Sequence, residues 1–281
     1  MGRLTFRFPL PNLVLLLLLI CAVRAAEVRT DSIPSAAMGK SIPVSIILPE
    51  VYRHSDSTFP VLYLLHGHGG SHRSWIDGTD VESLADLHRI IIVCPDGGIN
   101  SWYLDSVEDP ASRYETHVAG EVVSFIDAHY RTIADRRHRA ITGLSMGGFG
   151  ALHLATNHPE VFGGAGSISG GVDLRPFPNN WEIAEKLGSL ADNPERWNDL
   201  ALADHPVRFG HADLRLMVDC GTDDFFIGVN RSLHQALLEA GIDHTYLERP
   251  GVHNWDYWRE AIRWQADFFA VWFYQFTDVT R

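Results

Sequence analysis

Short apolar runs recur along the chain, separated by amphipathic or polar segments. Residues 59–65 read FPVLYLL and residues 90–94 read IIIVC. Runs of this length without alternation are typical of strands buried on both faces of a parallel sheet. Similar patterns predict further strands at 28–33, 42–48, 164–169, 214–220 and 244–248, and one immediately before Ser145.

Most of the segments between these runs have helical spacing. Helices are predicted over 80–88, with Asp80 as N-cap, and over 114–130, 229–240 and 258–273, and from Ser145 to about 158. Strands that alternate with helices predict an α/β fold with a mostly parallel sheet covered on both faces. Residues 170–211 break the alternation, and we predict an insertion there with short helices at 181–190 and 194–202.

The first 25 residues differ from the rest of the chain. Arg3 and Arg7 precede an unbroken apolar run over 13–23, which is too short to favour a membrane-spanning helix. Small residues precede a cleavage position after Ala25. We therefore predict a signal peptide at 1–25, a mature domain at 26–281 and a secreted or periplasmic protein. Retention of the segment as an anchor and lipidation at Cys21 are the alternatives.

The composition is that of a globular domain, with 46% hydrophobic and 21% charged residues in 281. Cleavage after Ala25 would remove three arginines and no acidic residue, so the formal charge of −12 would become −15. So acidic a surface argues against binding to nucleic acid, and against binding to a membrane once the signal is removed. Nothing in the chain indicates an oligomeric state.

Residues suited to catalysis follow the predicted strands. His66, Asp96, Ser145, Asp224 and His253 each come directly after one of the apolar runs or in the loop that follows it. In sheets of this class, reactive groups gather at the carboxyl ends of the strands. We therefore expect these side chains to share one edge of the sheet.

Ser145 is the predicted nucleophile. It lies in Gly143-Leu144-Ser145-Met146-Gly147, a G-x-S-x-G pattern between an apolar run and a helix start. Such a serine occupies a sharp strand-to-helix turn, where flanking glycines allow neighbouring backbone to approach closely. On its own, the pattern also fits an ordinary glycine-rich turn.

The order of the remaining candidates along the chain supports the nucleophile. A serine hydrolase of this fold places the acid and then the histidine after the serine, which here gives Asp224 and His253. Asp223 is the alternative acid, and the Gly-x-x-Asp spacing from Gly221 favours Asp224. Asp96 precedes Ser145 in the chain, so we expect it to brace its own loop.

Backbone N–H groups of Met146 and of His68, in the loop over 66–70, are the expected donors to an oxyanion. His66, His68 and His72 are an alternative set of metal ligands. They lack a carboxylate or cysteine partner at a zinc-binding spacing, so we predict no metal. The predicted chemistry needs no cofactor.

Four segments, LLHGHGGSHRSW, CPDGGINSWY, GLSMGGFGAL and DCGTDDF, resemble the esterase-D-like esterases of the α/β-hydrolase superfamily. The resemblance covers essentially the whole mature chain. It implies a triad of Ser145, Asp224 and His253, backbone donation by His68 and Met146, and a place near the acyl site for Ser101, Trp102 and Tyr103. His68 stands where relatives often have an apolar residue.

The resemblance implies a serine carboxylesterase acting on short-acyl or hydroxycinnamoyl esters, either small molecules or groups on plant polysaccharides. Trp75, Trp102, Tyr103 and Trp255 are candidates to contact a sugar or phenolic ring, although each also suits ordinary packing. An acyltransferase like the mycolyltransferases and a formylglutathione-hydrolase-like thioesterase are the alternative activities. A binding module that had lost the triad is the non-enzymatic alternative.

Cys94 and Cys220 both end predicted buried strands. The strand order of the superfamily separates these strands by several positions of about 4.8 Å each, beyond the roughly 7 Å limit for Cα atoms in a disulfide. We predict two free, partly buried thiols.

Overall fold

The computed structural model describes residues 25–276, and the predicted signal peptide lies outside them except for Ala25. Eight strands form one sheet in the order β1-β2-β4-β3-β5-β6-β7-β8. Only the pairs β1–β2 and β2–β4 are antiparallel, so the predicted, mostly parallel sheet is confirmed. The strands are β1 (Glu27–Ser35), β2 (Lys40–Leu48), β3 (Val61–Leu65), β4 (Ile91–Pro95), β5 (Arg139–Gly143), β6 (Gly164–Ile168), β7 (Arg215–Gly221) and β8 (Thr245–Arg249).

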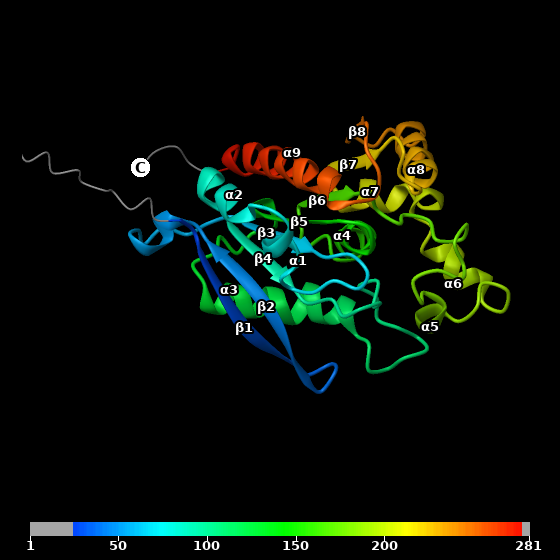
Figure 1. Ribbon diagram of the computed structural model, residues 1–281, viewed down its shortest axis with the longest axis horizontal. Helices are drawn as coiled ribbons and strands as arrows, with labels where there is room; N and C mark the ends of the chain where they lie inside the picture. Colours follow the sequence, from blue (N-terminus) through cyan, green and yellow to red (C-terminus); the bar gives the residue numbers. More distant parts are fainter. Residues whose placement is uncertain (1–24, 277–281) are drawn as a thin grey trace, which may run out of the picture.

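Helices cover both faces of the sheet (Figure 1). They are α1 (Ser74–Gly78), α2 (Val81–His88), α3 (Val123–His129), α4 (Met146–Asn157), α5 (Ala184–Leu187), α6 (Pro194–Asp199), α7 (Val207–Ala212), α8 (Ile227–Glu239) and α9 (Trp255–Tyr274). Within residues 25–276, none of the helices has the length and apolar character needed to cross a bilayer.

The central strand β3 shows why an unbroken apolar run is needed. Alternate side chains of a strand point to opposite faces. Leu62 and Leu64 pack in the core beneath α2 and α9, whereas Val61, Tyr63 and Leu65 pack in the core beneath α3, α4 and α8. All five are fully buried.

Two predicted helices differ in the structure. The helix predicted over 114–130 is present as one continuous helical segment over 114–129, but its stretch η2 (Thr116–Val122) is a π-helix, which α3 follows directly. The helix predicted over 181–190 is reduced to α5, because Trp181 and Glu182 have φ angles of +52° and +50°. These values are incompatible with a right-handed helix.

The rest of the insertion is more helical than predicted. The segment 194–202 forms α6, a 3₁₀ turn follows at Leu202–Asp204, and α7 was not expected. Asp80 precedes α2 as predicted, but its side chain does not cap the helix. Its carboxylate instead accepts a hydrogen bond from Arg263 of α9 at 2.5 Å.

Both described cysteines are free. β4 and β7, which hold Cys94 and Cys220, are separated by three intervening strands, so the prediction of free thiols is confirmed. The thiols are fully rather than partly buried, because helices cover both faces of each strand.

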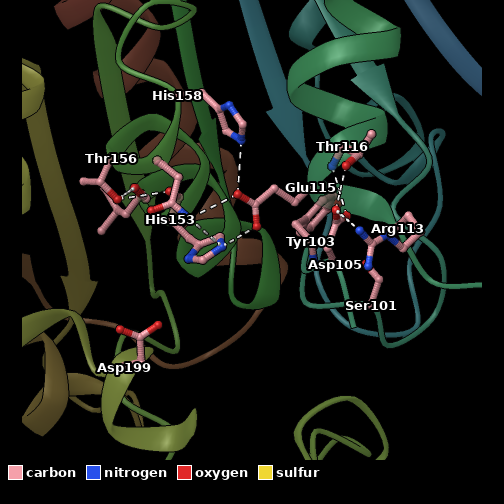
Figure 2. Close-up of polar contacts among 12 residues, drawn as sticks. Ser101, Tyr103, Asp105, Arg113, Glu115, Thr116, His153, Thr156, His158 and Asp199 are labelled. Atoms are coloured by element: carbon pink, nitrogen blue, oxygen red, sulfur yellow. Dashed lines mark hydrogen bonds and ion pairs between the residues drawn. The ribbon is translucent and has the colours of Figure 1, made fainter. Parts of the chain in front are cut away.

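Hydrogen bonds between polar side chains connect the end of α4 to the residue that precedes η2. The Glu115 carboxylate accepts hydrogen bonds from His153 at 2.9 Å, His158 at 3.1 Å and Asn157 at 3.1 Å. Figure 2 shows this carboxylate lying between the two imidazoles. Burial alone would raise the pKa of Glu115, but the bonds from His153 and His158 hold it well below its usual range. The bond to Glu115 raises the pKa of His158.

We expect Glu115→Ala to destabilise the protein by about 2–3 kcal/mol, since it removes charge-assisted hydrogen bonds. The stabilisation of the fold by the Glu115 carboxylate is fully present above pH 4.5 and is lost as the pH falls through the lowered pKa of Glu115. The stabilisation by protonated His158 is fully present below pH 6.5 and is lost as the pH rises through the raised pKa of His158. Urea unfolding should therefore show the largest difference from wild type between about pH 4.5 and 6.5. Glu195→Ala, at an exposed position of α6, is the control, and an effect of Glu115→Ala independent of pH would contradict this account.

Candidate active site

Ser145 occupies the sharp turn between β5 and α4. Its φ and ψ are +56° and −117°, outside the regions that residues with a side chain normally adopt. The turn is held by the Ser145 N–H, which donates to the Ile168 carbonyl at 2.9 Å. The Ser145 carbonyl accepts from Gly148 at 3.0 Å and from Phe149 at 3.1 Å. The strained conformation is thus fixed by backbone bonds on both sides.

His253 joins Ser145 to Asp224. Its Nε2 lies 2.9 Å from Ser145 Oγ, and its Nδ1 lies 2.8 Å from Asp224 Oδ2. A carboxylate can only accept, so the hydrogen of the neutral imidazole is on Nδ1. Nε2 is then free to accept the proton of the serine hydroxyl. This geometry allows the imidazole to act as a base toward Ser145 while Asp224 orients it.

Asp224 is held in place from its own loop. Its side chain is fully buried, and Oδ1 accepts a hydrogen bond from the Phe226 N–H at 2.8 Å. Asp223 is exposed and bonds to Thr222 instead. Asp96 accepts from the N–H groups of Gly98 and His72, so it braces its loop as expected.

The loop that carries His253 is anchored at both ends by Asp219 of β7. Asp219 is fully buried, and its carboxylate accepts hydrogen bonds from Arg249, at 3.0 Å, and from the Tyr257 hydroxyl. Arg249 ends β8 and Tyr257 lies in the first turn of α9, so the loop between them has fixed ends. Sequence reasoning missed Asp219. An acidic residue inside an apolar strand was the available signal.

His66 braces the loop over residues 66–70. The Gly97 N–H donates to His66 Nε2 at 2.8 Å, so the ring hydrogen is on Nδ1 and bonds to the Gly67 carbonyl, also at 2.8 Å. Burial lowers the pKa of His66, which favours this neutral form. The Tyr103 hydroxyl donates to the His66 carbonyl at 3.0 Å.

Two backbone amides beside Ser145 are not engaged. In the loop over residues 66–70, the N–H groups of Gly69 and Gly70 donate to the carbonyls of Ile99 and Gly67, respectively. Among residues 25–276, the N–H groups of His68 and Met146 have no hydrogen-bond acceptor. These are the two donors that the sequence predicted for an oxyanion.

The three histidines considered as metal ligands have other partners. His66 bonds as described, His68 Nε2 bonds to Glu182, and His72 Nδ1 bonds to Ser45 Oγ. Across the described part of the chain, no group of histidine, cysteine and acidic side chains is arranged to hold a metal ion.

A cavity of about 350 Å³ opens over Ser145 and His253. Four aromatic side chains contribute to its wall: Trp181, Phe225, Trp255 and Trp258. Trp255 is the one aromatic candidate from the sequence that lines it. Phe225 is adjacent to Asp224 and lies 4.3 Å from the His253 ring, measured between ring centroids.

The other aromatic candidates pack behind the cavity. Trp75 is fully buried and donates to the Leu65 carbonyl. Ser101, Trp102 and Tyr103 are also buried, and Trp102 packs against Trp181 at a centroid distance of 6.2 Å. These four residues are therefore packing residues of the core and do not line the cavity. Trp181 was missed because no strand or motif pointed to its side chain. Phe225 ends the segment DCGTDDF, but only the two aspartates of that segment were considered.

The chain matches the family model described as "Putative esterase" over residues 35–268. It belongs to this esterase family. Esterase Rv1288 of Mycobacterium tuberculosis (strain ATCC 25618 / H37Rv) is 32% identical over 246 residues, covering 78% of this chain and 54% of the relative. The chain thus spans about half the length of that relative.

Two further similarities cover more of the compared protein. An acetyl esterase of Caldicellulosiruptor saccharolyticus is 29% identical over 72% of this chain and 79% of its own length. The solved structure of a ferulic acid esterase matches with a TM-score of 0.76 and 29% identity, over 89% of this chain and 99% of that one. The chain therefore has the same α/β-hydrolase fold as this ferulic acid esterase.

We expect Gly147→Ala to lower the free energy of unfolding of this protein by about 1–3 kcal/mol. A Cβ at this position would lie 2.5 Å from the Leu65 carbonyl oxygen and 2.6 Å from that of His66, so backbone must shift. Gly228→Ala in α8 is the control, because its Cβ would meet nothing within 4 Å. It should leave stability unchanged or raise it by up to about 1 kcal/mol. Equal denaturation midpoints for the two variants would contradict this prediction.

Proposed function

We propose that this chain is a serine carboxylesterase that cleaves short-acyl or hydroxycinnamoyl esters through an acyl-enzyme. The observation that carries the proposal is the hydrogen-bonded series Asp224–His253–Ser145 at the base of an aromatic cavity. Membership of the esterase family supports the same chemistry.

In the proposed cycle, Ser145 Oγ attacks the ester carbonyl while His253 Nε2 takes its proton. The oxyanion accepts hydrogen bonds from the backbone N–H groups of His68 and Met146. His253 then protonates the leaving alcohol, and the acyl group stays on Ser145. Water, deprotonated by His253, attacks the acyl-enzyme. The bond between Ser145 Oγ and the acyl group then breaks, His253 returns the proton to Oγ, and the acid is released. Asp224 keeps the imidazole in the required tautomer and stabilises its protonated form.

The cavity and the relatives support the proposed substrate class. A cavity of about 350 Å³ has the size of a small-molecule site, and its aromatic wall suits a planar acyl group. Relatives named acetyl esterase and ferulic acid esterase act on esters of these two kinds. With the predicted signal peptide, this supports a secreted or periplasmic enzyme whose mature domain, 26–281, removes acyl groups from small molecules or polysaccharides. The insertion at 170–211 shapes its pocket.

We expect Ser145→Ala to abolish hydrolysis of p-nitrophenyl acetate, methyl ferulate and acetylated xylan while leaving the fold intact. Release of the free acids or of p-nitrophenol is the measurement. If the intact protein hydrolyses none of the three esters, the carboxylesterase proposal is wrong. If transfer to an added sugar exceeds hydrolysis, the enzyme is an acyltransferase using the same residues.

The neighbouring aspartates provide a matched pair. Asp224→Asn should lower kcat by about 10⁴-fold, because the amide favours the wrong imidazole tautomer. Asp223→Asn should change kcat less than about twofold, since its carboxylate is exposed and does not contact His253. Similar losses in both variants would remove the distinction that assigns the acid to Asp224.

A further inference from the structure

One side-chain contact joins the loop beside the nucleophile to the insertion. His68 Nε2 lies 2.5 Å from Glu182 Oε2, and the side chains are 26% and 50% exposed. The imidazole donates and the carboxylate accepts, whichever charge the histidine carries. His68 follows β3 and lines the cavity, whereas Glu182 precedes α5, so the bond links two segments that are distant in sequence.

Glu182 lies in an unusual turn. It and Trp181 are consecutive residues with a side chain in the left-handed region, at φ +50° and +52°. Residues with a Cβ seldom adopt this conformation unless the surroundings impose it. The turn therefore depends on the contacts that its two side chains make.

The Trp181 ring forms part of the cavity wall. It stacks on Phe225 with ring centroids 5.6 Å apart and planes inclined by 21°, and it packs at 5.1 Å against Phe226. Its carbonyl accepts a hydrogen bond from Trp102 Nε1 at 3.3 Å. Phe225 is half exposed and faces His253. A planar group bound above Ser145 would meet the wall formed by Trp181 and Phe225.

We propose that Glu182 is a positioning residue that, through its bond to His68, holds the Trp181 ring in the wall and so confers selectivity for aromatic acyl groups. A hydroxycinnamoyl ring gains contact area from a fixed aromatic wall. An acetyl group is too small to gain the same contact. The inference rests on the proposed esterase function but identifies a specificity determinant outside the triad.

The test compares wild type with Glu182→Ala, Glu182→Gln, His68→Ala and the Glu182→Ala/His68→Ala double variant. Binding of ferulate is followed by quenching of tryptophan fluorescence, which needs no turnover. Kinetics on p-nitrophenyl ferulate and p-nitrophenyl acetate give a selectivity ratio with the leaving group held constant. Glu195→Ala, at an exposed position of the same insertion, is the control.

We expect Glu182→Ala and His68→Ala each to weaken ferulate binding about tenfold and to lower the ferulate-to-acetate ratio of kcat/KM by a similar factor, mainly through KM. The double variant should lose no more than either single variant, because both remove one interaction. Glu182→Gln keeps an acceptor and should restore binding to within about twofold of wild type.

Unchanged ferulate binding in Glu182→Ala would overturn the inference, as would additive losses in the double variant. Failure of Glu182→Gln to restore binding would also overturn it. Wild-type protein that binds ferulate but hydrolyses no ester would instead refute the proposed function, leaving the role of Glu182 decided by the binding data.

Discussion

The active site depends on how closely the start of α4 approaches the end of β3. Gly147 lies so near the carbonyl oxygens of Leu65 and His66 that no Cβ fits between them. This contact places the turn at Ser145 beside the loop that contains His68. The proposed nucleophile and the proposed oxyanion donors are therefore positioned by a backbone contact rather than by flexible side chains.

The proposed acid, Asp224, and the proposed base, His253, are positioned by the other half of the sheet. β7 brings Asp224 to its carboxyl end, and the buried Asp219 of the same strand fixes both ends of the loop with His253. A buried carboxylate needs such partners, because an unpaired one would be strongly destabilising. The strand β7 thus positions Asp224 directly and His253 through the loop that carries it.

Much of this arrangement could be predicted from the sequence, and the reason is physical. Unbroken apolar runs identify strands buried on two faces. The order of Ser145, Asp224 and His253 along the chain predicts that they lie together, and the structure joins them by hydrogen bonds. The wall of the cavity could not be predicted in the same way. Trp181 lies in a left-handed turn that contains no glycine. Local helix propensity therefore predicted a helix at this position. Trp75 and Tyr103 were chosen as ring-contacting candidates for the same reason as Trp255, their aromatic side chains, but they are buried and do not line the cavity.

The two buried thiols offer a view of how the molecule opens. Burial raises the pKa of Cys94 and of Cys220 far above that of a free thiol, and neither has access to solvent. A thiol reagent can reach either one only when the surrounding strands separate from their helices. Because β4 and β7 belong to opposite halves of the sheet, the two labelling rates would report separately on the half that supports the His66 loop and the half that holds Asp224 and His253. The chain therefore has an internal probe for each half of the proposed catalytic site.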